Sequence, residues 1–529
     1  MVGAGQVTAL RAWLIAAAAA SAPALLGASL AGCAREIPPR GEAVLVVDTD
    51  LPVPSIVNRL RIDIYTADRS QWYVSREVQA LDPRDWPVSF SVYDPDDGSP
   101  RDVVVRLRAF QSGIVRDYHG ERFSPRPSGG AGSAATPAPI AAVPPGETPR
   151  LIADDGADAT PPNEPLPSVT VDRLVRVALV PGTRGSVRLV LRGACAGTMA
   201  DLAQGTSCID RDRSADAIET AALDPDLTLP STTLAGTFGA TTPCTADVRP
   251  SSNAPDGTPL FDDEVCVPGG ISILGTADAF GRGDFADVPQ RIALVAPFRM
   301  DRHEVTVGRY RDAVARGLLA PTQPYVNSGT VDFSDATALR SCTWSVTPLG
   351  RESLPVTCVR RATARAFCQF IGGDLPTEAQ WEYVATSVGR PAKTRFAWGD
   401  EAPSCDRAVW GRHASSALDF HAAACNKLGI GAAPVDMAFG DVALGTGIVG
   451  LSGNVTELMR DTFASLASSC WASQPLESPS CVDPKGTLFA IRGGSWLTNE
   501  AALSAGFRGG TADADAASET GFRCVREVP

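Results

Sequence analysis

The chain has little of several residue types that would point to particular functions. Its 529 residues include only four histidines and three lysines, and none of its 13 cysteines forms a Cys-x-x-Cys pair. These shortages argue against a structural zinc site, which needs a close cluster of cysteine and histidine ligands. The formal net charge is −13, from 47 Lys and Arg against 60 Asp and Glu. A nucleic-acid-binding protein normally has a basic face, so we expect no nucleic-acid partner.

The N-terminus predicts a targeting segment. Arg11 precedes a run of small apolar residues, 12–28, which is too short for a comfortable transmembrane helix. The run leads to residues 30–33 (LAGC), which resemble the bacterial lipobox, in which the cysteine becomes the lipidated first residue. We therefore expect residues 1–33 to be a lipoprotein signal peptide, with lipidation at Cys33, followed by a tether at 34–42. The alternative is an ordinary cleaved signal peptide with an incidental cysteine.

This resemblance also implies a location. Ala34 rather than aspartate follows Cys33, so the lipoprotein rule for retention in the inner membrane does not apply. We expect a bacterial outer-membrane lipoprotein, held at the membrane by its lipid, on the periplasmic or the surface face. Without Cys33, twelve cysteines remain in a chain that leaves the cytosol, and disulfide bonds are the default expectation.

The N-terminal half alternates apolar and polar residues with the period of β-strands. Residues 59–65 (RLRIDIY) and 102–110 (DVVVRLRAF) are examples, and turn residues separate such runs. We predict an antiparallel β-sandwich over residues 43–195, interrupted by a Pro-, Gly- and Ala-rich disordered insertion at about 124–169. Residues 196–261 are predicted to be a linker stapled by Cys195–Cys208, with Cys244–Cys266 as a second candidate bridge.

The C-terminal half predicts a few well-marked helices. Thr306 is a candidate cap for a helix that stops at Gly317, and Thr377 with Gln380 forms a capping box after Pro376. Between them, Cys368 lies on the apolar face of a third predicted helix. The rest is loop punctuated by glycine, with short strands.

Seven segments of this half, in order, resemble the formylglycine-generating enzyme, or sulfatase-modifying factor, family. They are 267–270 (VPGG), 298–306 (FRMDRHEVT), 375–383 (LPTEAQWEY), 398–400 (WGD), 453–457 (GNVTE), 492–496 (RGGSW) and 521–524 (GFRC). The resemblance implies that residues 262–529 adopt the α+β fold of that family, which is related to C-type lectin domains and has little regular secondary structure. It also implies a disulfide between Cys368 and Cys524.

The family's oxidation chemistry depends on two cysteines that follow the Gly-Gly-Ser turn and bind copper, for which thiolates are suitable ligands. Here those positions are Thr498 and Leu503, and neither can supply a thiolate. The resemblance therefore gives no confident catalytic residue, and we do not expect copper. What remains at the turn is an expected pocket lined by Ser495, Trp496, Arg492 and Thr456. Ionisable groups near its floor would favour an enzyme, and a neutral lining would favour binding.

Calcium is the other cofactor that the resemblance implies. Its ligands would be the carbonyls of Gly453 and Val455 and the side chain of Glu457, although the first ligand position of the segment is Gly450. Asn426 is a candidate for a second calcium site. The alternative is that Glu457 pairs with Arg460 or Arg492.

Arg492, Arg508 and Arg523 either line a pocket for an anion or bridge groups within the fold, and we favour the structural role.

Three hypotheses for function follow. The first is a lipid-anchored envelope protein whose sulfatase-modifying-factor-like domain is a non-catalytic binding or scaffold module for an envelope protein or glycan. The second is an enzyme, either an oxidoreductase of the formylglycine-generating type or one that uses the same cleft with an unrecognised site. In the third, the β-sandwich is the adhesive part.

Overall fold

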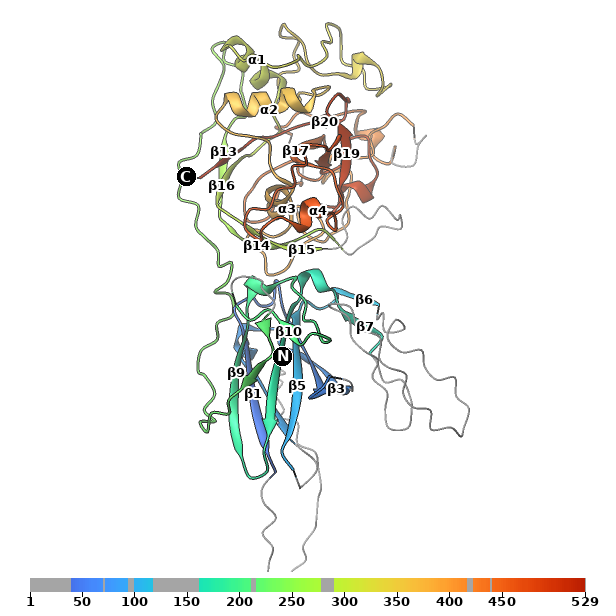
Figure 1. Ribbon diagram of the computed structural model, residues 1–529. Coiled ribbons are helices and arrows are strands. Elements are labelled where there is room, and N and C mark those ends of the chain that lie inside the picture. Colours follow the sequence, from blue (N-terminus) through green and yellow to red (C-terminus); the bar gives the residue numbers. More distant parts are fainter. Residues whose placement is uncertain are drawn as a thin grey trace, which may run out of the picture.

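The computed structural model describes residues 40–69, 72–93, 99–117, 161–210, 216–276, 290–415, 422–437 and 440–528. The predicted signal peptide, the lipidation site Cys33 and all but the last residues of the predicted tether lie outside these ranges. Across the described ranges, no helix combines the length and apolar character needed to cross a membrane. Figure 1 shows two parts, a β-rich N-terminal domain and a larger C-terminal domain, joined by a long extended stretch.

The N-terminal domain consists mainly of two sheets that share one hydrophobic core. One sheet has the order β4-β1-β9, with β4 at Val88–Tyr93, β1 at Glu42–Thr49 and β9 at Arg184–Leu191. The other has the order β12-β8-β5-β2-β3, formed by Glu219–Ala221, Val171–Leu179, Arg101–Phe110, Arg59–Thr66 and Trp72–Gln79. Alternate residues of both sheets, such as Leu45 and Leu189 on one and Val105 and Val175 on the other, point into the core.

The prediction of a wholly antiparallel arrangement is wrong at two places. β1 runs parallel to β9, and β12 runs parallel to β8. A parallel pair needs a long connection between its two strands. The chain between β1 and β9 forms β2, β3, β5 and β8 of the other sheet, and these strands make up most of that connection. β12 also lies inside the predicted linker, as do the short β10 (Thr206–Ser207) and β11 (Asp216–Ala217), so that segment is partly folded onto the domain.

The predicted disordered insertion, about 124–169, lies mostly outside the described residues. Its last part, from residue 161, is described and is ordered into elements. β7 (Asn163–Pro165) pairs with β6 (Val115–Asp117), and a 3-10 helix, η3, covers Pro167–Val169. Glu164 of β7 is buried against Arg108 and Arg116, so this part of the segment is bound to the sheet by ion pairs as well as by strand pairing.

The C-terminal domain has short sheets and few helices, as the sequence predicts. Its sheets are β13-β16-β21, β14-β15 and β19-β18-β17-β20. Their bounds are β13 Glu264–Val267, β14 Gly270–Leu274, β15 Arg291–Val295, β16 Phe298–Asp301, β17 Thr456–Thr462, β18 Leu488–Arg492, β19 Gly509–Ala512, β20 Thr520–Gly521 and β21 Val525–Glu527. The helices are α1 (Val307–Ala315), α2 (Arg361–Phe370), α3 (Glu378–Thr386) and the short α4 (Ser469–Ala472).

Two of these helices begin where the sequence predicts. The hydroxyl of Thr306 accepts a hydrogen bond from the amide of Arg309 at the start of α1. Thr377 and Gln380 form the predicted capping box at the start of α3. Caps depend on residues three positions apart, so the local sequence is sufficient to specify them.

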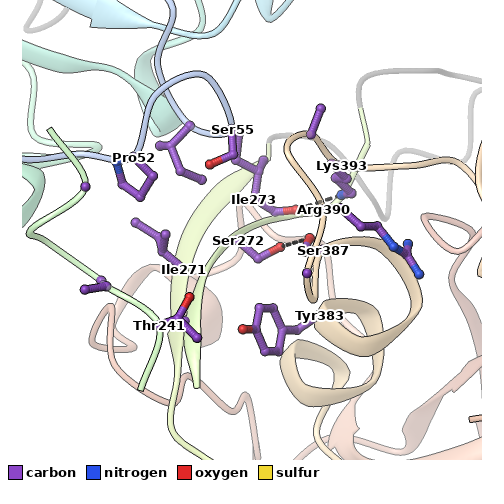
Figure 2. A pocket seen from close by; sticks show the side chains of 17 residues that line it. Pro52, Ser55, Thr241, Ile271, Ser272, Ile273, Tyr383, Ser387, Arg390 and Lys393 are labelled. Atoms are coloured by element: carbon purple, nitrogen blue, oxygen red, sulfur yellow. Dashed lines mark hydrogen bonds between the residues drawn. The ribbon is translucent and has the colours of Figure 1, made fainter. Parts of the chain in front are cut away.

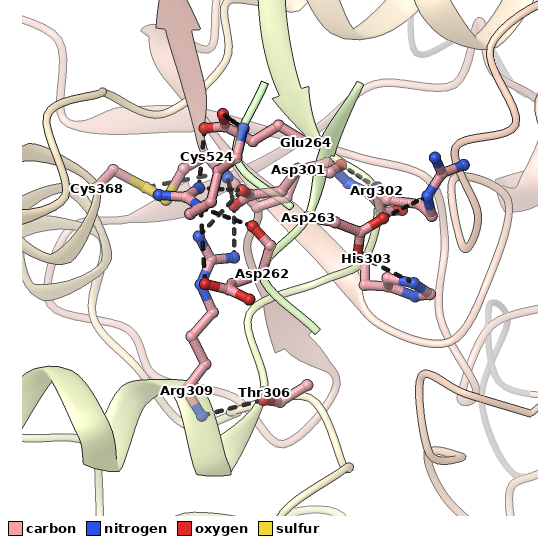
Figure 3. Close-up of polar contacts among 12 residues, drawn as sticks. Asp262, Asp263, Glu264, Asp301, Arg302, His303, Thr306, Arg309, Cys368 and Cys524 are labelled. Carbon is pink, nitrogen blue, oxygen red and sulfur yellow. Dashed lines mark hydrogen bonds and ion pairs between the residues drawn. A yellow bond between two sulfur atoms is a disulfide. The ribbon is translucent and has the colours of Figure 1, made fainter. Parts of the chain in front are cut away.

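The first and last strands of the C-terminal domain meet at a cluster around Asp301 (Figure 3). β16 pairs with both β13 and β21. Asp301 accepts hydrogen bonds from the amide of Cys524 at 2.9 Å and from the guanidinium of Arg309 at 3.0 Å. Beside it, the disulfide Cys368–Cys524 joins α2 to the segment before β21. The domain is therefore closed by residues more than 200 positions apart.

All twelve cysteines in the described residues form disulfides. The structure contains Cys195–Cys208, Cys244–Cys266 and Cys368–Cys524, as expected. Three further bridges complete the set: Cys342–Cys358, Cys405–Cys425 and Cys470–Cys481.

Candidate functional site

The turn at residues 492–498 follows β18, and its two glycines determine its backbone conformation. Gly493 and Gly494 have φ values of +96° and +66°. A Cβ on Gly493 would lie 2.9 Å from the carbonyl oxygen of Leu451, and one on Gly494 would lie 2.8 Å from that of Ala502. Both positions therefore need glycine, for conformation and for space. The turn brings the backbone close to the segment that carries Asn454 and Glu457.

The side chains that follow the glycines are packed into the protein. Ser495 and Trp496 are fully buried. The Trp496 ring lies 5.2 Å from the ring of Phe333, and its Nε1 donates to the carbonyl of Ser518 at 3.4 Å. Arg492 is also fully buried and Thr456 is 7% exposed. These four residues do not form the open pocket that the sequence led us to expect.

The two positions of the expected copper cysteines are part of this packing. The hydroxyl of Thr498 accepts a hydrogen bond from the amide of Ser495 at 2.9 Å, which closes the turn. Leu503 ends the 3-10 helix η8 (Glu500–Leu503) and is fully buried against Phe396, Trp398 and Trp410. The side chains packed around Leu503 are apolar.

Three buried arginines hold the domain together beneath this turn. Arg492 pairs with Glu382 of α3, with Glu378 3.6 Å away, and Arg508 binds Glu378 through two hydrogen bonds of 2.6 and 2.7 Å. Arg523 pairs with Glu457 at 2.7 Å. None of the three arginines is more than 5% exposed, so they act within the fold, as expected, and present no anion site.

Glu457 does not fit the expected calcium site. Its carboxylate accepts hydrogen bonds from Nε of Arg523 at 2.8 and 2.9 Å and from Nε1 of Trp381 at 2.8 Å. The guanidinium of Arg523 therefore supplies the positive charge next to the Glu457 carboxylate. The ion-pair partner of Glu457 is Arg523, and not Arg460 or Arg492, the two candidates from the sequence. A calcium ligand needs oxygens that are free to face the ion.

The other expected calcium ligands lie in three different surroundings. Asn426, the candidate for a second calcium site, begins a short 3-10 helix, η7 (Asn426–Leu428). Gly453 lies with its α-carbon against the backbone of Val409, and Val455 packs in an apolar cluster beside Trp496. In the described parts of the chain, no three His, Cys, Asp or Glu side chains are grouped as metal ligands.

A cavity beside this segment has a different character. It has a volume of about 290 Å³ and is lined by Glu304 and Asp441 together with several valines. Burial raises the pKa of Glu304 to about 8, and the negative charge of Glu457 adds to the rise while Arg523 opposes it. Burial likewise raises the pKa of Asp441 to about 7. Perturbed ionisable groups in a cavity are typical of functional sites.

The sequence analysis did not single out either of these carboxyl groups. Glu304 lies inside the segment 298–306 that carries the family resemblance, and this was the one available signal. Asp441 lies in a glycine-rich stretch with no recognisable pattern. Neither residue has a partner nearby in the sequence that would suggest a site.

The family model for the sulfatase-modifying factor enzyme 1-like domain matches residues 251–528, just over half of the chain. The chain belongs to this family. Among characterised family members, the formylglycine-generating enzyme of Streptomyces coelicolor is 30% identical over 303 residues, which cover 50% of this chain and 89% of that protein. The enzyme of the same name from Thermomonospora curvata is 29% identical over 299 residues, covering 50% and 93% of the two chains.

Among solved structures, PvdO from Pseudomonas aeruginosa is similar over 54% of this chain and all of the PvdO chain. The sequence identity is 20% and the TM-score is 0.39. The family domain, residues 251–528, accounts for the C-terminal half of the chain.

A second cavity, of about 360 Å³, lies between the family domain and the N-terminal domain (Figure 2). Pro52 and Ser55 line it from one side, and Ser272 of β14 and Tyr383 of α3 line it from the other. The ammonium of Lys393 at its edge donates to the carbonyl of Ile273 at 2.7 Å and pairs with Glu382. This cation is therefore used within the fold, and the cavity wall is mostly hydroxyl and apolar.

Proposed function

We propose that the C-terminal domain is a binding or scaffold module that lacks the copper-dependent oxidation of its enzymatic relatives. The observation that carries the proposal is the pair of side chains at the expected cysteine positions. Thr498 closes a turn and Leu503 fills an apolar core. Every cysteine among the described residues is in a disulfide, so no free thiolate of that part of the chain is available to copper.

The test is a copper-loading and oxygen-consumption assay with a cysteine-containing sulfatase peptide. We expect no copper-dependent oxygen uptake above background and no aldehyde in the peptide. The matched control is the double variant Thr498→Cys with Leu503→Cys, which should gain Cu(I) affinity in a chelator competition. Turnover by the natural chain would overturn the proposal.

We also propose that the protein is lipid-anchored at Cys33 in a bacterial envelope, where its partner is an envelope protein or glycan. Residues 30–33 (LAGC) support this proposal. Metabolic labelling with palmitate should mark the natural chain and not the Cys33→Ser variant. Equal labelling of both would contradict the anchor.

The alternative, an enzyme with an unrecognised site, has one supporting observation, the carboxyl groups of Glu304 and Asp441.

A further inference from the structure

The cavity beside Glu304 combines two buried carboxyl groups with an apolar wall. Val409, Val435, Val442 and Val449 provide much of that wall. Cavities of this kind, largely apolar with a few polar groups, are the usual form of small-molecule sites. The two carboxyl groups decide which chemistry the cavity suits, so their partners matter.

Asp441 has one carboxyl oxygen without a partner. The residue is only 4% exposed. Its Oδ2 accepts a hydrogen bond from the amide of Ser452 at 2.7 Å. Its Oδ1 is buried and, among the described residues, has no hydrogen-bond partner. A buried carboxyl oxygen without a partner is costly, because it has lost water and gained nothing in exchange.

Glu304 is the second buried carboxyl group in the cavity wall. It is 1% exposed, and its Oε1 accepts a hydrogen bond from Nδ2 of Asn454 at 3.1 Å. Its carboxyl group also lines the cavity. Gly450, with a φ of +71°, borders the carboxyl group, and a Cβ there would lie 3.1 Å from both oxygens. The glycine therefore leaves the space that the carboxyl group of Glu304 occupies.

The nearby cation does not contact either carboxyl group. Nε of Arg523 donates to Glu457, and its two terminal nitrogens donate to the carbonyls of Asp301, Arg302, Val449 and Gly450. Its hydrogen-bonding capacity is fully used by these groups. The cavity thus offers two carboxyl groups that a cation from outside would stabilise.

We propose that this cavity binds a small organic cation, with an ammonium group held by Oδ1 of Asp441 and by the carboxyl group of Glu304. An alkyl ammonium fits better than a metal ion for two reasons. No three His, Cys, Asp or Glu side chains of the described chain are grouped as metal ligands. The valines that line the cavity match an alkyl group, and His303, Asp436 and Asn454 are the other polar side chains in its lining.

This inference rests on the proposed binding function and gives it a ligand class. The two can fail separately, because oxygen consumption tests the loss of oxidation and an amine titration tests the cavity. The experiment is isothermal titration of the full chain with n-butylamine, n-butanol, butyrate and calcium chloride at pH 9, where both carboxyl groups are ionised and an alkyl ammonium keeps its proton. We expect saturable binding of n-butylamine and at least about tenfold weaker binding of the neutral alcohol, since a charged hydrogen bond is lost.

Matched variants locate the binding. Glu304→Gln and Asp441→Asn should each weaken n-butylamine binding by about tenfold or more. Asp461→Asn removes another buried carboxyl group, which does not line the cavity, and should leave the affinity unchanged. If either cavity variant misfolds, Val442→Trp tests the site from its partly exposed wall and should block binding.

Several results would overturn the inference. One is no saturable binding of n-butylamine by the natural chain. Another is equal binding of amine and alcohol, which would show that the carboxyl groups play no part. A third is calcium binding that n-butylamine does not displace and that Glu304→Gln abolishes, which would make the cavity a metal site. Amine binding that Val442→Trp leaves intact would place the ligand elsewhere.

Discussion

The turn at residues 492–503 and the cavity beside Glu304 belong to one domain and differ in what they can do. At the turn, Leu503 is fully buried and the hydroxyl groups of Thr498 and Ser495 accept hydrogen bonds within the fold. In the cavity, two carboxyl groups line open volume, and one oxygen of Asp441 has no partner among the described residues. A family motif can therefore survive as packing while the groups with unused bonding capacity lie elsewhere. Three predictions test this contrast.

The largest effect is expected at Arg523, behind the cavity. Arg523→Met would leave Glu457 buried without its cation, beside the carboxyl groups of Glu304 and Asp441. Breaking a buried pair in this way costs about 3–5 kcal/mol. Urea unfolding followed by tryptophan fluorescence measures the loss. Adding Glu457→Gln should restore part of the stability, because the unpaired charge is then gone. A loss below about 1 kcal/mol in the single variant would mean that Arg523 is not holding this region.

A smaller effect is expected at Leu503, in the closed turn. Leu503→Ala opens a cavity among Phe396, Trp398 and Trp410, and the free energy of unfolding should fall by about 2–4 kcal/mol. Val442→Ala is the matched truncation at the wall of the open cavity, where the side chain is 39% exposed. It should cost less than about 1 kcal/mol. Equal losses at the two positions would contradict the contrast between a packed turn and an open cavity.

The pH dependence of stability sharpens the comparison further. The folded pKa of Glu304 is raised to about 8 from its ordinary value of 4.5, so the folded state holds a proton that the unfolded state releases. The stabilisation from this proton is present at low pH and is lost as pH rises through about 8. Between pH 6 and pH 7 one such group changes the free energy of unfolding by at most about 1.4 kcal/mol.

Glu304→Gln should remove that part of the slope, as measured by urea unfolding at pH 6 and pH 7. Asp461, whose pKa is raised to about 7 by burial and by Glu378, serves as the control. Asp461→Asn should flatten the slope without affecting the cavity. An unchanged slope in Glu304→Gln would show that its carboxyl group is already ionised at pH 6.

The sequence predicted the features that depend on short spacings or on a family motif. The caps at Thr306 and Thr377 need residues only three positions apart, and local sequence is enough to find them. It could not predict the pairing of Glu457 with Arg523, which are 66 positions apart and meet only once the domain has closed. The sequence analysis offered Arg460 and Arg492 instead, which are nearer along the chain.

The candidate site was harder to predict than the fold. The motif at 492–496 drew attention to a pocket that packing fills with Trp496 and Leu503, and side-chain packing depends on distant residues such as Phe333. Asp441 has no local pattern at all. Its relation to Glu304 exists only in three dimensions, across 137 positions of intervening chain that the fold brings back together.

The pairing of β16 with β21 has a consequence for how this domain is made. The strand at 525–527 lies beside a strand made more than 220 residues earlier, and Arg523 and Cys524 come from the same late segment. During synthesis on the ribosome, Glu457 therefore lacks its cation and Cys368 lacks its disulfide partner until this last segment has been made. Chaperones and oxidising enzymes have their longest opportunity in that interval, and a message cut short before codon 521 would yield a domain that cannot close.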